Sequence, residues 1–463
     1  MSKHKKKNRK KTENQFIDQI HLNAAGIDIG SQVHYVAVPP GRDPECKDVR
    51  SFASFTADLY ALANWLKECK IDKIAMESTG VYWIPLFEIL DAQGFDVILV
   101  NPRHFKNVPG RKTDVVDCQW LQQLHTFGLL QGAFRPEFQI CELRAYLRQR
   151  AMLISYAAKH IQHMQKALEQ MNVKLTEVIS DVTGQTGMKI IRAIIAGERS
   201  PKKLASMRNP RCKNDTDVIA KALQGTWKNE HLFALQQAVE LFDFYKKQID
   251  DCEARIQKQL ETFDDRSNGL PLPSKRKKSN AHHPLSFDAN SFLYKMTGVD
   301  LTCIAGIDSP TALCILGEIG LDMNRWPTVK NFASWLGLSP GSKISGGKVL
   351  SSKTKPSANR AANAFRLAAY SLQRSKSALG AFFRRKKAQL GSPKAITATA
   401  HKIARIFYLM LKYGTEYKDL GQDYYEDRYQ NRMINNLKKR AKQFGYKLEI
   451  DQTFKQLTAD FPS

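Results

Sequence analysis

The sequence predicts an α/β domain followed by a mainly helical remainder, and three observations support this fold class. Strand and helix signals alternate through residues 22–130. Long runs with apolar residues every three to four positions follow at 138–174 and 232–262. Helical periodicity returns in residues 291–415. Because hydrophobic periodicity is the main signal of secondary structure in a sequence, these regions are expected to differ in architecture.

The first region is expected to alternate short strands with amphipathic helices. Strands are predicted where apolar and β-branched residues gather, and helices where apolar residues recur at helical spacing. In chain order we expect a strand hairpin in GIDIGSQVHYVAVPP, a helix in DLYALANWLKECK, a strand in IDKIAMEST, a helix in IPLFEILDAQG, a strand in FDVILVNP and a helix in CQWLQQLHTFGLL.

The middle of the chain is expected to be helical. The two long amphipathic runs at 138–174 and 232–262 could form an antiparallel hairpin, an oligomerising coiled coil or an ordinary bundle within one chain. Between them, the glycines of TGQTGMKIIRAIIAG predict a turn before a short helix. Residues 264–290 have the composition of a linker.

The C-terminal helical domain opens with LTCIAGIDSPTALCILGEIG, which predicts two short helical segments around Gly306. This is typical of a helix-hairpin-helix unit, in which backbone N–H groups approach a phosphate, and equally of a plain pair of packed helices. The expected division of the chain is a basic disordered tail at 1–21, an α/β domain at 22–135, a helical region at 136–263, a linker at 264–290, a helical domain at 291–415 and a helical tail at 416–463.

The charge balance indicates a polyanionic partner. The chain of 463 residues has 71 Lys and Arg against 45 Asp and Glu, a formal net charge of +26. From Met323 to Thr415 there is no Asp or Glu, although Lys and Arg recur throughout. Since a solvated surface normally mixes both signs, we expect this stretch to lie along phosphates. The basic runs at Lys3–Lys11 and Lys275–Lys278 are interpreted as flexible tails.

Other classes of protein are disfavoured by what the sequence lacks. No apolar run reaches the roughly 18 residues of a membrane span, and the N-terminus has no apolar core of a signal peptide. The eight cysteines are scattered, without the spacing of a zinc site or a disulfide framework. We therefore expect a soluble, cytoplasmic protein.

Four carboxylates lie in three short windows of the first domain. Asp28 in GIDIGS and Glu77 in IAMESTG each follow an apolar run, where a strand ends at an open crevice. Asp114 and Asp117 in KTDVVD are spaced i, i+3 and so share one helix face. Alone, each acid could be a turn residue, a strand end or a helix cap. Together they predict one site at which carboxylate oxygens hold Mg²⁺ against a substrate phosphate.

A serine in the C-terminal domain is a second candidate. Ser345 is followed by two glycines and is expected in a loop between Lys343 and Lys348. An open backbone and nearby cations suit a nucleophile that attacks a phosphodiester, but an SGG sequence also forms plain turns.

The motifs resemble a known family. GIDIG, MESTGVY, NPRHFKNVPGRKTDVVD, the TGQTG segment, GIDSPTA, FASWLGLSPGSKISGGK and KAITATAHKIARIFYLML are similar, in this order, to insertion-sequence transposases that join a RuvC-like DEDD domain to a serine-bearing transposase domain, the RNA-guided bridge recombinases. The resemblance spans roughly residues 22–415. It implies an RNase H-like (RuvC-like) first domain and a metal site on Asp28, Glu77, Asp114 and Asp117. From the resemblance together with the periodicity of the long helical runs, we expect a coiled-coil middle and a nucleoid-associated location in a prokaryote.

The resemblance also implies a mechanism. Mg²⁺ on the four acids orients a DNA phosphate, and Ser345 attacks it to form a covalent phosphoserine link before strand exchange between double-stranded donor and target DNA. A guide (bridge) RNA selects both DNAs, and the protein acts as a dimer or tetramer. Residues placed near nucleic acid are Lys112, Lys343, Lys348, Lys353, Lys355, Arg360 and Arg366.

Two departures from the family pattern stand out. Cys118 follows the last acid where the family usually has Ala, which is a change between small residues and should leave the metal site intact. The N-terminal extension, the 264–290 linker and the tail from Glu416 make the chain longer than compact members, so guide contacts cannot be transferred to it.

Two other functions remain open from the sequence. The chain could be a metal-dependent Holliday-junction nuclease in which the acids activate water and Ser345 is only a turn residue. It could also be a non-catalytic nucleic-acid scaffold, which would tolerate loss of Asp28 or Glu77. Thr113, directly before the acidic pair, could contact phosphate but is better explained as the cap of the following helix.

Overall fold

The computed structural model describes residues 18–101, 113–272, 283–356 and 359–449. The chain divides into two compact units, residues 1–135 and 136–463, and each unit is described by itself. The predicted flexible runs Lys3–Lys11 and Lys275–Lys278 lie outside the described residues. Within the described part, no helix is long and apolar enough to cross a membrane.

The first unit is built on a five-stranded mixed sheet with the order β3-β2-β1-β4-β5. β1 pairs antiparallel with β2, and β2 with β3, while β1, β4 and β5 are parallel neighbours. The strands are β1 (Ala24–Ile29), β2 (Val33–Ala37), β3 (Val49–Ala53), β4 (Lys73–Glu77) and β5 (Asp96–Val100). The predicted hairpin and the two later strands are present, but the sequence analysis missed β3.

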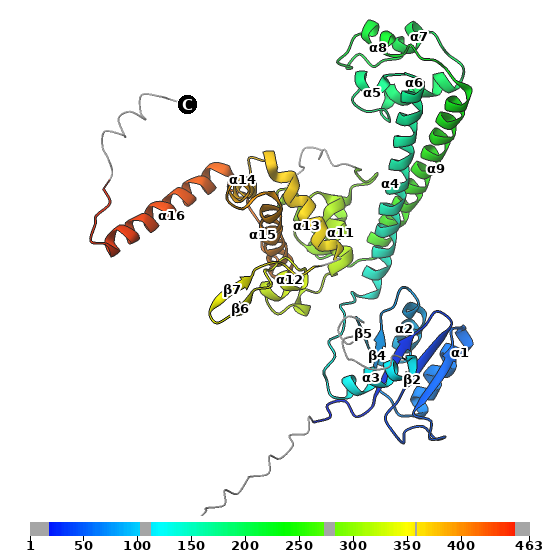
Figure 1. Ribbon diagram of the computed structural model, residues 1–463, viewed down its shortest axis with the longest axis vertical. Coiled ribbons are helices and arrows are strands. Elements are labelled where there is room, and N and C mark those ends of the chain that lie inside the picture. The colour runs from blue at the N-terminus through cyan, green and yellow to red at the C-terminus, as the bar shows by residue number, and fades with distance from the viewer. Residues whose placement is uncertain (1–17, 102–112, 273–282, 357–358, 450–463) are drawn as a thin grey trace, which may run out of the picture. The chain divides into compact units, whose positions relative to one another are not determined.

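Helices cover both faces of this sheet (Figure 1). α1 (Thr56–Glu68) and α2 (Trp83–Ala92) pack on one face, where Leu62, Leu66 and Leu90 are fully buried against Ile27 and Met76. α3 (Asp114–Thr126) lies on the other face, where Leu121 packs against Ala75 and Val100. Because side chains alternate along a strand, Gly26 and Asp28 of β1, and Ala75 and Glu77 of β4, belong to the α3 face.

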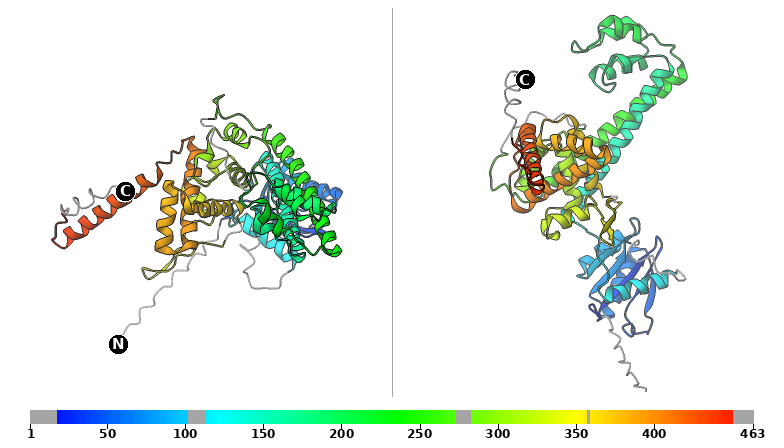
Figure 2. Two further views of the ribbon diagram at one scale, coloured as in Figure 1. Left: turned by 90° about the horizontal axis from the view of Figure 1, so that it is seen from above. Right: turned by 60° about the vertical axis from the view of Figure 1, so that its left-hand side comes forward.

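The second unit begins with a pair of long helices that run side by side (Figures 1 and 2). They are α4 (Phe138–Gln170) and α9 (Asn229–Leu260), close to the predicted runs. Between them, a small helical tip has a core of its own that contains Leu204, Ile219 and Leu223. The tip consists of α5 (Leu175–Val178), α6 (Gln185–Ile195), α7 (Pro201–Ser206) and α8 (Thr216–Ala222), of which the sequence analysis expected only α6.

A buried ion pair joins the two long helices. Arg150 on α4 and Glu253 on α9 approach to 2.7 Å, with 10% and 3% of their side chains exposed. Arg150 also donates to the carbonyl oxygen of His283, and Glu253 accepts from the backbone N–H of Ser286. A buried pair of charges is tolerated when further hydrogen bonds satisfy both groups, as here.

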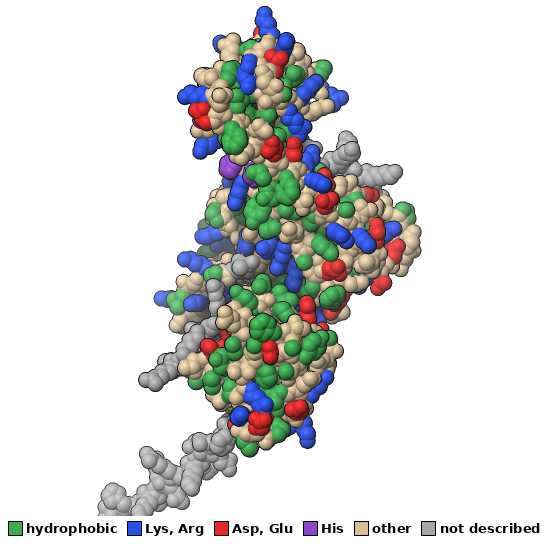
Figure 3. All heavy atoms as spheres, turned by 90° about the vertical axis from the view of Figure 1, so that its right-hand side faces the viewer, with side chains coloured by type: hydrophobic (Ala, Val, Ile, Leu, Met, Phe, Trp, Pro, Cys, Tyr) green, Lys and Arg blue, Asp and Glu red, His purple; other side chains and the backbone are tan. Residues whose placement is uncertain are grey.

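Apolar side chains are also exposed along this helical pair. Met152, Phe233 and Phe244 are among them. Figure 3 shows hydrophobic side chains on one face of the pair.

The rest of the second unit is helical around one small hairpin. Its elements are α10 (Ala289–Thr297), η2 (Leu301–Cys303), α11 (Ser309–Ile319), η3 (Met323–Arg325), α12 (Val329–Trp335), β6 (Lys343–Ser345), β7 (Lys348–Ser351), α13 (Arg360–Ser371), η4 (Leu372–Arg374), α14 (Ala378–Leu390), α15 (Ser392–Tyr413) and α16 (Gly421–Gln443). The expected linker therefore ends just before 289, where α10 begins.

The turn around Gly306 differs from the expected pair of helical segments. The first segment is a single 3-10 turn, η2, and only the second, α11, is an α-helix. Gly306 has φ of +88°, and a Cβ there would lie 2.6 Å from the carbonyl oxygen of Ala368 on α13. The glycine therefore allows a left-handed turn and a close approach to α13.

Candidate active site

Asp28 and Glu77 lie side by side at one end of the sheet in the first unit. β1 and β4 are parallel, and Ile27 pairs with Met76, so the next residue of each strand is Asp28 or Glu77. Both belong to the face covered by α3. The carboxyl ends of neighbouring parallel strands are a common place for a binding crevice.

The N-terminus of α3 supplies the other two acids. The Thr113 side chain accepts a hydrogen bond from the backbone N–H of Val116, so the prediction that Thr113 caps this helix is confirmed. Asp114 is exposed and Asp117 half-buried, both in the first helical turn. The partial positive charge of a helix N-terminus stabilises carboxylates at these positions.

Gly26 lets α3 approach the sheet, and the sequence analysis missed it. A Cβ at this position would lie 2.3 Å from both the carbonyl oxygen of Cys118 and the backbone nitrogen of Gln122. These are backbone atoms, so α3 could not stay where it is if residue 26 had a side chain. A glycine inside a strand marks such a close approach, and this signal was available in GIDIG.

The structure brings the four carboxylates into one electrostatic site, which we call the DEDD site (Asp28, Glu77, Asp114 and Asp117). The pKa of Asp28 is raised from 3.8 to about 7, first because burial disfavours the charged form. The negative charges of the other three acids raise this pKa further, as does a hydrogen bond between Asp28 and Glu77. Below about pH 7 the site therefore holds a proton that a cation could replace.

The donor set suits a hard divalent cation, although the side chains are not arranged around one. All four donors are carboxylates, the ligands that Mg²⁺ prefers. Among the residues that the structure describes, however, no group of three His, Cys, Asp or Glu is placed to hold a metal ion. Binding would thus require side-chain movement at the DEDD site, driven by relief of the repulsion that raises the Asp28 pKa.

Thr79 is a second residue that the sequence analysis missed. Its hydroxyl donates to Oε1 of the buried Glu77 over 2.7 Å. A hydrogen bond of this kind fixes the orientation of a carboxylate that is largely shielded from water.

Cys118 is buried directly behind the acids. Its thiol donates to the carbonyl oxygen of Val115, and its pKa is raised to about 12 by burial first and by the charge of Asp28 second. The residue therefore remains a neutral thiol and adds no further charge to the DEDD site.

Ser345 lies at the end of strand β6. The sequence had predicted a loop at this position. β6 and β7 form an antiparallel hairpin in which Ser345 pairs with Lys348. The two-residue connection is Gly346 and Gly347, with φ of +54° and +75°. Two positive φ angles define the tight hairpin turns that glycine favours, so the SGG sequence is explained by this turn.

The hairpin is exposed on both faces. Residues directly opposite each other on paired strands share a face, so Lys348 lies beside Ser345, while Ile344 and Val349 lie on the other face with 64% and 63% exposure. The hairpin thus presents a hydroxyl and an ammonium group together. At its base, the N–H of Gly341 donates to the carbonyl oxygen of Lys353.

The other predicted nucleic-acid contacts are scattered around this hairpin. Lys343, Lys353 and Lys355 are exposed on or next to it, and Arg360 is exposed at the first turn of α13. Arg366 is half-buried and, six residues further along α13, lies on a different side of the helix. Lys112 lies outside the described residues.

The DEDD site and Ser345 belong to different units of the chain, 1–135 and 136–463. Comparison with known proteins gives two family matches, the first of which extends past the boundary between the units into α4. Residues 25–173 match a family model described as a DEDD transposase of the IS110 type, and residues 300–384 match one described as the transposase IS116/IS110/IS902 family. No curated protein matches the chain.

Proposed function

Because the chain belongs to the IS110 family of transposases, with a RuvC-like DEDD domain, we propose that the DEDD site and Ser345 act together in DNA strand cleavage and rejoining. The observation that carries this proposal is the placement of Asp28 and Glu77 at the ends of neighbouring parallel strands, where burial and three neighbouring acids raise the pKa of Asp28 to about 7. Perturbed carboxylates in such a group are typical of a functional site.

The fold of the first unit supports this proposal. The order β3-β2-β1-β4-β5, with three antiparallel and then parallel strands, is the arrangement expected of an RNase H-like domain. Asp28, Glu77, Asp114 and Asp117 would hold Mg²⁺, which would neutralise and orient the phosphate to be cleaved. Thr79 and Gly26 would act through these acids, by orienting Glu77 and by seating α3.

The serine step balances without a further reactant. The Ser345 hydroxyl oxygen attacks phosphorus, the bond from phosphorus to the DNA 3′-oxygen breaks, and the serine proton is lost as the 3′-hydroxyl gains one. A 3′-hydroxyl of the second DNA then attacks the phosphoserine, which restores the serine. Lys348, beside Ser345, would stabilise the negative charge that develops on the phosphate oxygens.

We further propose a guide RNA and a homo-oligomer as partners, which rest on the sequence resemblance. The acid-free residues 323–415 supply cations for nucleic-acid backbones. The four acids and Ser345 lie in different units of the chain, which is compatible with an active site whose parts come from two protomers. If base pairing with the guide RNA selects the DNA sequence, the protein itself needs to recognise mainly the shape and the phosphates of the nucleic acids.

The experiment looks for a covalent product. Purified protein is incubated with RNA from the element's flanking region, matched donor and target DNA, and Mg²⁺, and then denatured. We expect a protein–DNA adduct in the wild type that is absent in Ser345→Ala, while Ser342→Ala, a nearby exposed serine, keeps it. An adduct that persists in Ser345→Ala would contradict the proposal.

A second candidate function is a metal-dependent junction nuclease. The observation in its favour is that all four acids lie within one unit, without need of Ser345. It predicts Mg²⁺-dependent cleavage of branched DNA that Ser345→Ala leaves unchanged and Asp28→Asn abolishes.

A further inference from the structure

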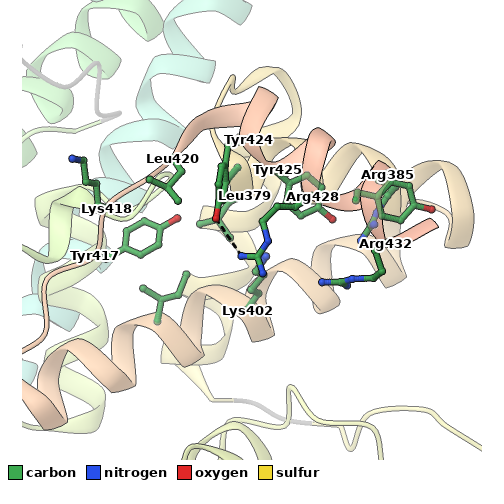
Figure 4. Close-up of a pocket in the computed structure, with 13 residues that line it drawn as sticks. Leu379, Arg385, Lys402, Tyr417, Lys418, Leu420, Tyr424, Tyr425, Arg428 and Arg432 are labelled. Carbon is green, nitrogen blue, oxygen red and sulfur yellow. Dashed lines mark hydrogen bonds between the residues drawn. The ribbon is translucent and has the colours of Figure 1, made fainter. Parts of the chain in front are cut away.

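The C-terminal helix α16 completes a pocket with α14 and α15 (Figure 4). The pocket has a volume of about 300 Å³, at the lower end of the range of small-ligand sites. None of the described α16 residues is buried, so this helix contributes little to a hydrophobic core. Its contact with α14 instead consists of aromatic and basic side chains.

Cations from all three helices converge on the pocket. Arg385 comes from α14, Lys402 from α15, and Arg428 and Arg432 from α16, as Figure 4 shows. The pKa of Lys402 is lowered, first by burial and then by the charges of four arginines, of which three line the pocket. This is a concentration of positive charge that a bound anion would relieve.

Two hydrogen-bond donors on residues that line the pocket are buried and have no partner among the described residues. Within the described part of the chain, neither Nε of Arg385 nor the hydroxyl of Tyr425 has a hydrogen-bond partner. Leaving a buried donor unsatisfied costs stability, so native proteins seldom do so without a ligand or water to accept the bond. Both residues line the pocket, so a small movement of their side chains would bring these donors to a bound acceptor.

Tyrosine rings form the walls and hold the cations in place. The Arg385 guanidinium lies 3.9 Å from the ring centre of Tyr429, and the Lys402 ammonium 5.3 Å from that of Tyr425. Arg428 donates to the hydroxyl of Tyr424, which is itself 44% exposed. A cation is attracted to the face of an aromatic ring, so these contacts hold the charged groups in position. The exposed ring of Tyr424 remains available for a planar group to stack on.

We propose that this pocket binds one unpaired nucleotide of a single-stranded nucleic acid, its phosphate on Arg385, Lys402 and Arg432 and its base against the tyrosines. An acidic peptide would satisfy the cations but would leave the aromatic walls unused. A duplex keeps its bases stacked inside and cannot present one to a pocket of this size. The inference does not rest on the serine or metal chemistry proposed above.

The test measures binding of eight-residue labelled strands to the full-length protein without Mg²⁺, by fluorescence anisotropy. The strands are oligo-dU, oligo-rU, a dU duplex with its complement, and a sugar–phosphate backbone of equal length without bases. Arg432→Gln should weaken single-strand binding about tenfold and reduce the salt dependence by about 0.7 in log–log slope. Tyr424→Leu should weaken it at least about fivefold with the slope unchanged.

Matched controls separate the pocket from general charge. Lys438→Gln removes an equal charge from an exposed site on the same helix, and Tyr446→Leu removes a tyrosine that is 75% exposed outside the pocket. Both should bind within about twofold of wild type. Lys402→Met removes a half-buried charge that is crowded by arginines, so this variant should keep its melting temperature. Weaker binding at an unchanged melting temperature cannot be attributed to unfolding.

The outcomes are distinct. A preference of rU over dU, or the reverse, identifies the natural source of the nucleotide and supports the proposal either way. Equal binding of the base-free backbone, equal binding of the duplex, or pocket variants that match their controls would overturn it. Ser345→Ala should bind all strands as the wild type does, so failure of the proposed chemistry leaves this result intact.

Discussion

Asp28 and Glu77 end neighbouring parallel strands and share a hydrogen bond between their carboxyl groups. Such a bond requires a proton, and burial with three nearby acids holds it there by raising the pKa of Asp28 to about 7.

The raised pKa predicts how stability depends on pH. Between about 3.8 and 7 the folded protein binds the Asp28 proton and the unfolded protein does not, so the metal-free protein loses stability as pH rises through this window. Asp28→Asn should remove this dependence and raise the melting temperature at pH 8. Thermal unfolding with chelator at pH 5 and 8 measures both. Equal pH dependence in the variant would contradict the assignment.

Metal binding should show the opposite pH dependence. Since a cation must displace the Asp28 proton, stabilisation by Mg²⁺ should be greater at pH 8 than at pH 6. The melting-temperature shift on adding Mg²⁺ measures this, with Asp28→Asn as the variant in which the shift should largely vanish. The exposed Asp91→Asn, in the same unit, should retain it.

Gly26→Ala should separate α3 from the sheet. Its Cβ would lie 2.3 Å from two backbone atoms of α3, and overpacking of this kind typically costs about 1–3 kcal/mol. We also expect loss of the Mg²⁺ stabilisation, because Asp114 and Asp117 move with the helix.

Gly132→Ala is the matched control in the same unit. Among the described residues its Cβ would meet only the Ile98 side chain, at 3.3 Å, which needs to move by a few tenths of an ångström at most. Chemical denaturation of the two variants compares their free energies of unfolding. A Gly26→Ala protein as stable as Gly132→Ala, with its Mg²⁺ response intact, would refute this role for Gly26.

The turn beside Ser345 predicts opposite effects of two substitutions. Gly346 has φ of +54°, and a Cβ there would meet none of the described residues within 4 Å, so we expect backbone conformation to decide the outcome. Gly346→Asn places Asn-Gly, a favoured hairpin turn, and should retain covalent adduct formation. Gly346→Val should cost the turn about 1–2 kcal/mol and lower the adduct yield.

Quantifying the adduct at early times distinguishes these variants. Equal yields from Asn and Val would mean that the hairpin conformation does not matter for the reaction. In that case Ser345 would act from a rearranged segment, and its position at the end of β6 would carry no functional meaning.

The buried pair Arg150 and Glu253 predicts a non-additive result. Arg150→Met leaves Glu253 charged and buried without its partner, which typically costs about 3–5 kcal/mol. Arg150→Met combined with Glu253→Leu should cost clearly less than the two single effects added together. Urea denaturation of the four proteins measures this cycle, and additive effects would show that the two charges do not depend on each other.

The sequence predicted elements whose periodicity is strong, and missed those that depend on contacts far along the chain. β1 and β4 have clear apolar patterns and were located correctly, while α3 was predicted at 118–130 and lies at Asp114–Thr126. β3 has Arg50 and Ser51 at its centre and is half-exposed at the sheet edge, so its pattern is weak. The small helices α5, α7 and α8 are fixed by the tip core and are too short for a periodic signal.

For the candidate site, residue types were predictable and geometry was not. The spacing of Asp114 and Asp117 predicts a shared helix face, and Asp28 and Glu77 follow apolar runs. The glycine in GIDIG signals a close approach of backbone, but the sequence does not say that α3 is the element that approaches Gly26. The nature of the Ser345 segment depends on whether two glycines form a loop or a hairpin turn, and both interpretations fit the letters SGG.

The pairing of α4 with α9 imposes an order on how the chain becomes structured during synthesis. The end of α9 at Leu260 is 90 residues beyond the end of α4 at Gln170. At about 5–20 residues per second, a ribosome needs roughly 5–20 seconds to supply that partner. During this interval the first unit can already fold, but the apolar residues of α4 that later pack against α9 remain exposed to solvent. We therefore expect chaperone contact or premature self-association of the nascent protein to occur chiefly at this helix.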